Sequence, residues 1–274
     1  MHARTIASMA LGTTALLAMT ACGPDAESAS GASTPAATPS AALDTLPVDQ
    51  ILAKSGAAMD ALQSVHVTGT LSNTTDGKTA DGTPVAAGTS IKMDLSVDKK
   101  GNCRGTMHVA GTGALSIIRT AELVHVNGDA EFWRNIAAQK KASKKQENAV
   151  VGAFAARWVR IPTSNPQARQ MSAACDQVTP LTSVGANAVK ARESGTSLID
   201  GRAVVAVSAQ TAQGQDETYW IATEGTPHLL KALVGGETAG EIAYSAFDTP
   251  VDTTPPADSE VIDIAKLTPT GADS

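Results

Sequence analysis

The chain has 274 residues, of which 42% are hydrophobic, so it can form one large domain or two small ones. Its formal net charge of −6 argues against a nucleic-acid partner, because binding to phosphates needs a basic surface. Aromatic residues make up only 3% of the chain, so Ala, Val, Leu and Ile must fill most of the core.

The first residues form a short basic and then apolar segment that ends at a cysteine. Arg4 precedes the apolar stretch 6–18, which has the length of a signal-peptide core and is shorter than the roughly 20 residues of a transmembrane helix. The stretch Met19-Thr20-Ala21-Cys22 follows. It resembles the lipobox of bacterial lipoproteins, with Met in place of the usual Leu. The resemblance implies that residues 1–21 are a lipoprotein signal peptide and that Cys22 becomes a lipidated N-terminus. An ordinary signal peptide or a stop-transfer anchor is the alternative.

The next segment, up to residue 46, consists almost entirely of Ala, Ser, Thr, Pro and Gly. Such a composition buries too little apolar surface to offset the entropy of ordering. We therefore expect residues 22–46 to be a disordered tether with an r.m.s. span of about 25–30 Å. The folded domain is expected over residues 47–267, followed by a flexible tail at 268–274.

The start of that domain has a helical pattern, and strand patterns follow it. From Pro47, apolar residues recur on one helical stripe that includes Ile51, Leu52 and Met59. Residues 65–71 and 90–97 then alternate between apolar and polar, which is typical of antiparallel strands with one polar face. We expect the apolar residues of both strands to face inward, where the helices pack: Val65, Val67, Leu71, Ile91, Met93, Leu95 and Val97.

The rest of the domain is predicted to contain mainly strands with helices in the middle. Strands are expected at 102–110, 114–120, 122–127, 130–135 and 157–162, and later at 187–198, 202–211, 216–223, 228–235 and 239–247. A helix is expected over 136–156 and a shorter one around Cys175. This order favours an α+β fold, in which helices pack on one face of a large curved antiparallel sheet, over a βαβ architecture.

Two cysteines, Cys103 and Cys175, remain besides Cys22. An exported chain meets an oxidising environment, so the simplest interpretation is one disulfide between them, and two buried free thiols are the alternative. No histidine in the sequence is placed to activate either thiol.

Other motifs give weak signals for chemistry. Ser96 and Lys99 match an S-x-x-K pattern, but Ser96 is expected on a strand and the partner motifs are missing. We predict no catalytic residue, no metal and no cofactor. The histidines His66, His108, His125 and His228 lack zinc-ligand spacing and are expected on exposed strand faces. The lysine cluster, Lys140, Lys141, Lys144 and Lys145, is either a patch for anionic headgroups or a solvated helix face.

Several stretches together resemble the LppX/LprAFG lipoproteins of actinobacteria, whose fold is similar to that of LolA and LolB. The matching stretches are "SVHVTGTLS", "ARWVRIP", "ETYWIATEGTPHLLKALVGG" and "EIAYSAFDTPVDTTPPADSEVIDIAKL". The resemblance implies an open half-barrel, with helices on its concave face, that encloses an apolar cavity for acyl chains of a lipid or glycolipid. The seven inward-facing residues named above, from Val65 to Val97, are then the candidates that line this cavity.

The leading hypothesis is therefore a monomeric, non-enzymatic lipoprotein, anchored on the extracytoplasmic face of the cell membrane, that carries or presents a lipid. A membrane transporter is a further possible partner. The alternative is an envelope interaction or regulatory module on the same scaffold, which recognises a partner protein or lipoprotein.

Overall fold

A computed structural model describes residues 42–78, 84–176, 184–185 and 188–266, which belong to one compact unit. Cys22, the predicted signal peptide, most of the predicted tether and the predicted tail at 268–274 lie outside the described residues. None of the helices in the described part of the chain is long and apolar enough to cross a membrane.

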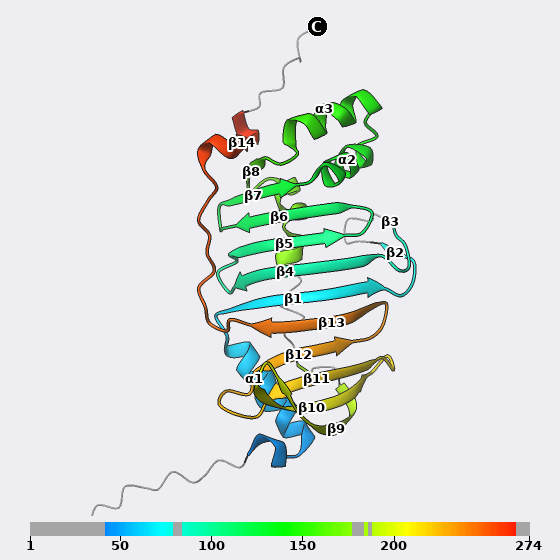
Figure 1. The fold of residues 1–274 in the computed structure, drawn as a ribbon, viewed down its shortest axis with the longest axis vertical. Coiled ribbons are helices and arrows are strands. Elements are labelled where there is room, and N and C mark those ends of the chain that lie inside the picture. Colours follow the sequence, from blue (N-terminus) through cyan, green and yellow to red (C-terminus); the bar gives the residue numbers. More distant parts are fainter. Residues whose placement is uncertain (1–41, 79–83, 177–183, 186–187, 267–274) are drawn as a thin grey trace, which may run out of the picture. The chain divides into compact units, whose positions relative to one another are not determined.

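One large sheet of twelve strands dominates this unit (Figure 1). Its spatial order is β14-β8-β7-β6-β5-β4-β1-β13-β12-β11-β10-β9, and β14 and β8 are its one parallel pair among the described strands. The strands are β1 (Ser64–Asn73), β4 (Ser90–Asp98), β5 (Cys103–Val109), β6 (Gly113–Arg119), β7 (Leu123–Gly128), β8 (Trp158–Pro162), β9 (Ala188–Ile199), β10 (Arg202–Thr211), β11 (Asp216–Ala222), β12 (Leu229–Val234), β13 (Thr238–Ser245) and β14 (Val261–Asp263). A separate two-residue pair joins β2 (Gly77–Lys78) to β3 (Pro84–Val85).

In the middle of the sheet, a strand from the start of the folded chain pairs with a strand from near its end. β1 pairs with β4 on one side and with β13 on the other, so Val67 lies opposite both Leu95 and Tyr244. Most of the remaining neighbours follow each other as hairpins, such as the two-residue turn Asp200-Gly201 between β9 and β10. The exceptions are β7 and β8, which are separated by α2 and α3, and the parallel pair of β8 with β14.

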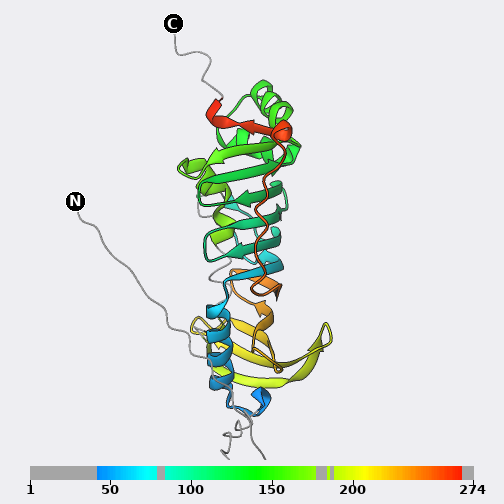
Figure 2. The same cartoon turned by 90° about the vertical axis from the view of Figure 1, so that its left-hand side faces the viewer.

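The inner face of the sheet is the face that carries Val67, Leu95, Val126 and Ile221. The four α-helices described in full contribute to one hydrophobic cluster with this face. These helices are α1 (Val48–Ala61), α2 (Ala130–Gln139), α3 (Lys144–Phe154) and α4 (Pro166–Met171). Figure 2 shows the sheet from its side, with α1 along it and the β9–β10 hairpin curling outward. The predicted fold class, α+β with helices on one face of a large curved antiparallel sheet, is confirmed.

The predicted amphipathic helix is also confirmed, as α1. Its buried residues are Ile51, Leu52, Ser55 and Met59, so the apolar stripe packs on the sheet. The alternation in β1 is confirmed as well, because Val65, Val67 and Leu71 are buried whereas Thr70 is exposed.

The strand expected at 130–135 is wrong, because this segment is the first half of α2. Asp129, which looks like a turn residue in the sequence, caps the helix: its carboxylate accepts hydrogen bonds from the Phe132 amide at 2.7 Å and the Ala114 amide at 2.9 Å. The single helix expected over 136–156 is two helices. Lys141 has a positive φ of 55°, and Ser143 starts α3 with a capping box to Gln146.

The segment from Phe247 to β14 runs along one end of the strands and reaches from β13 to β8 (Figure 1). We call residues 247–263 the C-terminal strap. Phe247 stacks on His228 with ring centroids 4.2 Å apart, and Arg104 on β5 pairs with Asp252 at 3.0 Å. At the far end Arg160 on β8 pairs with Asp263 at 3.0 Å. The strap thus contacts both halves of the sheet.

Candidate functional site

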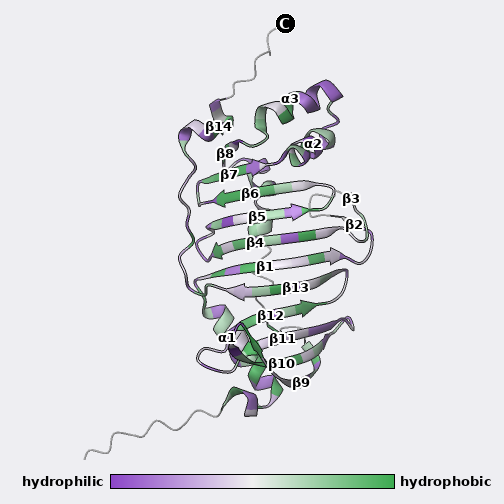
Figure 3. Ribbon diagram, viewed as in Figure 1, coloured by the Kyte–Doolittle hydropathy of each residue, from purple (hydrophilic) through white to green (hydrophobic). Residues whose placement is uncertain are grey.

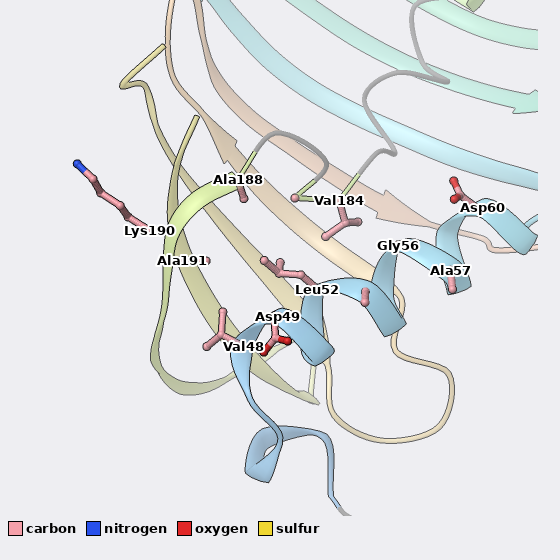
Figure 4. Close-up of a pocket in the computed structure, with 12 residues that line it drawn as sticks. Val48, Asp49, Leu52, Gly56, Ala57, Asp60, Val184, Ala188, Lys190 and Ala191 are labelled. Carbon is pink, nitrogen blue, oxygen red and sulfur yellow. The ribbon is translucent and has the colours of Figure 1, made fainter. Parts of the chain in front are cut away.

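An open groove of about 850 Å³ lies between α1 and the chain that leads into β9. Figure 4 shows its two walls. Its lining comes from α1 and from residues 184–191: Val48, Asp49, Leu52, Ala53, Gly56, Ala57, Asp60, Val184, Gly185, Ala188, Lys190 and Ala191.

The middle of the groove is apolar and built from small residues. Leu52 and Val184 lie at its centre, whereas Lys190 points away from it (Figure 4). A Cβ on Gly185 would lie 3.1 Å from the Leu52 methyl carbons, and one on Gly56 would lie 3.7 Å from the Val184 carbonyl oxygen. The two glycines therefore let the walls approach each other without filling the groove.

The groove lining is chemically mixed. Asp49 and Asp60 are exposed and contribute polar surface, whereas Leu52, Val184 and the alanines contribute aliphatic carbon. Each methylene buried there would contribute about 0.8 kcal/mol to binding. No cluster of His, Cys, Asp or Glu in the described part of the chain could hold a metal ion.

The seven residues expected to line a cavity lie in the core and not along this groove. Val65, Val67, Leu71, Leu95 and Val97 are each at most 8% exposed, and Ile91 and Met93 are half-buried against the same cluster. Figure 3 shows the hydrophobic colouring distributed over these central strands. Their role as a cavity lining stays a prediction.

Cys103 and Cys175 form a disulfide with Cα atoms 5.9 Å apart. Both cysteines are buried, and the bond ties β5 to the helical stretch that follows α4. It closes a loop with a sequence separation of 72 residues.

Three polar residues on the outer face of the sheet have the order of a Ser–His–Asp triad. The Ser96 Oγ lies 2.9 Å from the His66 Nδ1, and the His66 Nε2 lies 3.5 Å from an Asp94 carboxylate oxygen. Acyl transfer also needs donors for an oxyanion. β1 and β4 are each paired on both sides, so their backbone amides are used within the sheet. We therefore interpret the set as cross-strand polar pairing.

The histidines do not all lie on exposed strand faces, and that expectation is wrong for two of them. His125 on β7 is only 4% exposed, and burial together with the nearby Arg160 lowers its pKa. His228 precedes β12 and stacks on Phe247; burial, with Arg202 nearby, lowers its pKa too. Both imidazole rings are covered by neighbouring side chains, and the alternation of apolar and polar residues in the sequence does not reveal such a cover.

The lysine cluster, Lys140, Lys141, Lys144 and Lys145, is exposed around the turn between α2 and α3. Lys144 is paired with Glu147 at 2.6 Å. This position fits both alternatives, a solvated surface and a patch for anionic headgroups.

Of the groove residues of α1, the sequence pattern indicated Leu52, as part of the apolar stripe, but not the small residues beside it. Ala53, Gly56 and Ala57 lie outside the apolar stripe that identifies the helix, and small residues there resemble an ordinary solvated face. The signal that could have found them is the lack of any long side chain at 56 to 58, in "SGAAMD".

No protein-family model matches the chain, and no curated protein matches it. Among solved structures it is similar to the lipoprotein LppX of Mycobacterium tuberculosis, with 18% identity and a TM-score of 0.45 over 76% of this chain and 100% of that one. LprF from Mycobacterium bovis has 18% identity and a TM-score of 0.47, over 77% of this chain and 97% of that one. A LolA superfamily protein from Nitrosomonas europaea has 9% identity and a TM-score of 0.25, over 74% and 93%. The family expected from the sequence is thus represented among these structures.

Proposed function

We propose that this protein is a membrane-anchored lipoprotein of the cell envelope that binds an acyl chain of a lipid or glycolipid and carries or presents it. The observation that carries the proposal is the open groove beside α1, whose centre is formed by Leu52, Val184 and small residues. The aliphatic part of such a groove can bury an acyl chain, and each buried methylene would contribute about 0.8 kcal/mol to binding.

The sequence supports the anchor. The lipobox-like stretch ends at Cys22, and the tether that follows is rich in Ala, Ser, Thr and Pro. A tether with a span of about 25–30 Å would let the domain, and with it the groove, move near a membrane surface while staying attached.

The test is to block the groove with a substitution that does not weaken the fold. Gly56 lies within α1 at ordinary contact distance from Val184, so Gly56→Leu would place a side chain in the groove. Leu also favours a helix over Gly by up to about 1 kcal/mol. Gly152→Leu on α3 is the matched control, since no atom lies within 4 Å of the Cβ it would add.

Both variants would be made in the chain carrying Cys22→Ser and titrated with cis-parinaric acid, a fluorescent fatty acid. We expect Gly56→Leu to weaken binding at least about tenfold, because blocking two methylenes already removes about 1.6 kcal/mol. Gly152→Leu should bind like the parent. Equal affinity in all three proteins would contradict the groove as the acyl site.

Native mass spectrometry of the same protein, purified from a lipid-replete bacterial host, tests whether cargo is present. A discrete mass excess that disappears on organic extraction would support the proposal. A bare polypeptide mass together with no binding of the fatty acid would favour the alternative, recognition of a partner protein.

A further inference from the structure

A second pocket, of about 310 Å³, lies far from the groove, where several strand ends meet α4. It is formed by the β4–β5 turn, the β6–β7 turn, the residue after β8, and α4 with the segment that leads to the disulfide. Its charged lining residues are Lys100, Arg119, Arg169 and Asp176.

Arg119 is the fixed element of this pocket. Its side chain is 13% exposed, and its Nε donates to the Gly101 carbonyl oxygen at 2.9 Å. One terminal nitrogen, Nη1, donates to the Ser172 carbonyl oxygen at 3.4 Å. These backbone contacts orient the guanidinium but do not neutralise its charge.

The one anion paired with Arg119 among the described residues is an exposed carboxylate. The Asp176 Oδ1 lies 2.8 Å from Nη1 of Arg119, yet the Asp176 side chain is 65% exposed. A largely hydrated carboxylate contributes little net stability to an ion pair, because it keeps much of its water and is free to leave.

The pocket is also more basic than the protein as a whole. Its lining contains three cations, Lys100, Arg119 and Arg169, against the single carboxylate of Asp176, in a chain of net charge −6. A recessed guanidinium with further cations at its rim is the usual arrangement for binding a phosphate or a carboxylate.

We propose that this pocket binds an oxyanion, a phosphate or carboxylate group, which displaces Asp176 from Arg119. In the free protein the Asp176 carboxylate occupies the position beside Arg119 that the ligand would take. Cys175 directly precedes Asp176 and is bonded to Cys103 on β5. The disulfide therefore keeps the backbone of Asp176 at the pocket.

The oxyanion site is separate from the acyl groove. Seven strands lie between β6, which carries Arg119, and β9, which borders the groove. At the usual strand spacing this is about 38 Å along the sheet, so one small ligand does not fill both. The inference goes beyond the proposed function and does not depend on it.

The experiment uses the chain with Cys22→Ser and follows the backbone amide signals of Gly101 and Ser172, which every variant retains, by NMR during titrations. The probes are inorganic phosphate, dihexanoylphosphatidic acid and dihexanoylphosphatidylcholine. The variants are Asp176→Asn, Arg119→Gln and, as a control for net charge, Lys266→Gln, at a position after β14 that is exposed and outside the pocket.

We expect Asp176→Asn to bind phosphate about tenfold more tightly than the parent, since a competing charge-assisted hydrogen bond is gone. Arg119→Gln should abolish saturable binding, and Lys266→Gln should leave it unchanged. If Asp176 were only structural, its substitution would lower stability and leave phosphate affinity as it was; that result would overturn the proposal. Binding of phosphatidylcholine as tight as that of phosphatidic acid would overturn it as well.

The remaining comparison identifies the source of the ligand. Phosphatidic acid binding at least about tenfold more tightly than inorganic phosphate would assign the site to a lipid headgroup, and equal affinities would assign it to a free oxyanion. Titration of the same variants with cis-parinaric acid tests the groove independently, so the two proposals can fail separately.

Discussion

The two ends of the inner face differ in what covers them. At the β6–β8 end, α2 and α3 place three aromatic rings together: Trp133 lies 5.1 Å from both Phe132 and Phe154, measured between ring centroids. At the β9 end, α1 covers the sheet with its apolar stripe and presents Ala53, Gly56 and Ala57 to the side. The first end is filled, and the second keeps a groove.

Both ends use the same alternating strands, so the volume of the covering side chains decides where space remains. The covering helices differ in this respect, since α2 and α3 carry Phe132, Trp133 and Phe154 whereas α1 carries no aromatic residue. The filled end should therefore carry stability, and the groove end should carry binding.

Loss of the disulfide gives the largest expected effect. Replacing Cys103 and Cys175 with serine should lower the free energy of unfolding by about 4 kcal/mol, because a long loop is released in the unfolded chain. Urea unfolding monitored by circular dichroism measures this. Under native conditions the folded fraction should bind cis-parinaric acid as the parent does, and a parallel loss of affinity would contradict the division of roles.

Truncation of the aromatic cluster is next. Trp133→Ala should cost about 3 kcal/mol, because it removes a side chain that is only 4% exposed. Trp133→Phe should cost less than about 1.5 kcal/mol, since the buried indole nitrogen has no hydrogen-bond partner among the described residues.

The matched substitution at the other end is Ala57→Ser. This residue is exposed along the groove, so the free energy of unfolding should change by less than about 0.5 kcal/mol. Thermal unfolding of the three variants side by side makes the comparison. A cost for Ala57→Ser close to that of Trp133→Ala would remove the distinction between the ends.

The C-terminal strap is expected to contribute less. Asp263→Asn should destabilise the protein by about 1 kcal/mol, because the carboxylate is half-buried beside Arg160. Asp258→Asn is the control: this residue is 94% exposed and 3.6 Å from the same arginine, so the cost should be below about 0.5 kcal/mol. Chemical unfolding measures both, and equal costs would show that burial does not matter here.

The smallest effect is a dependence of stability on pH. Burial lowers the pKa of His125 and His228 from the usual 6.5, so the unfolded chain binds protons more readily in mildly acidic solution. Stability should be complete above pH 6.5 and decrease as the pH falls below it. His125→Gln should flatten this slope between pH 7.5 and 5.5, whereas His108→Gln, at an exposed position, should leave it unchanged.

Elements with a clear period could be predicted from the sequence. The helix from Pro47 and the strands β1 and β4 show strong alternation or a 3.6-residue period, and the turn residues mark the later hairpins. The disulfide followed from the cysteine count in an exported chain. The start of α2 was missed because Asp129 serves equally well in a turn and as a helix cap.

The groove and the oxyanion pocket were not predictable in the same way. Both bring together segments distant in sequence, such as Leu52 with Val184, and Arg119 with Asp176. Small residues on a helix side and a single arginine at a strand end carry no periodic signal. Which of these residues meet depends on how the strands pair and how the helices pack in the folded chain.

The pairing of β1 with β13 also sets the order in which the molecule can assemble. Asn73 and Thr238 at one end of this pair are 165 residues apart, which makes the contact slow to form because a long loop must close first. Until β13 is available, β1 and β12 both remain edge strands, and the filled half and the groove half are separate sheets. A growing or truncated chain that stops before Thr238 therefore exposes the edges of β1 and β12, and also that of β8, because its partner β14 comes later in the chain.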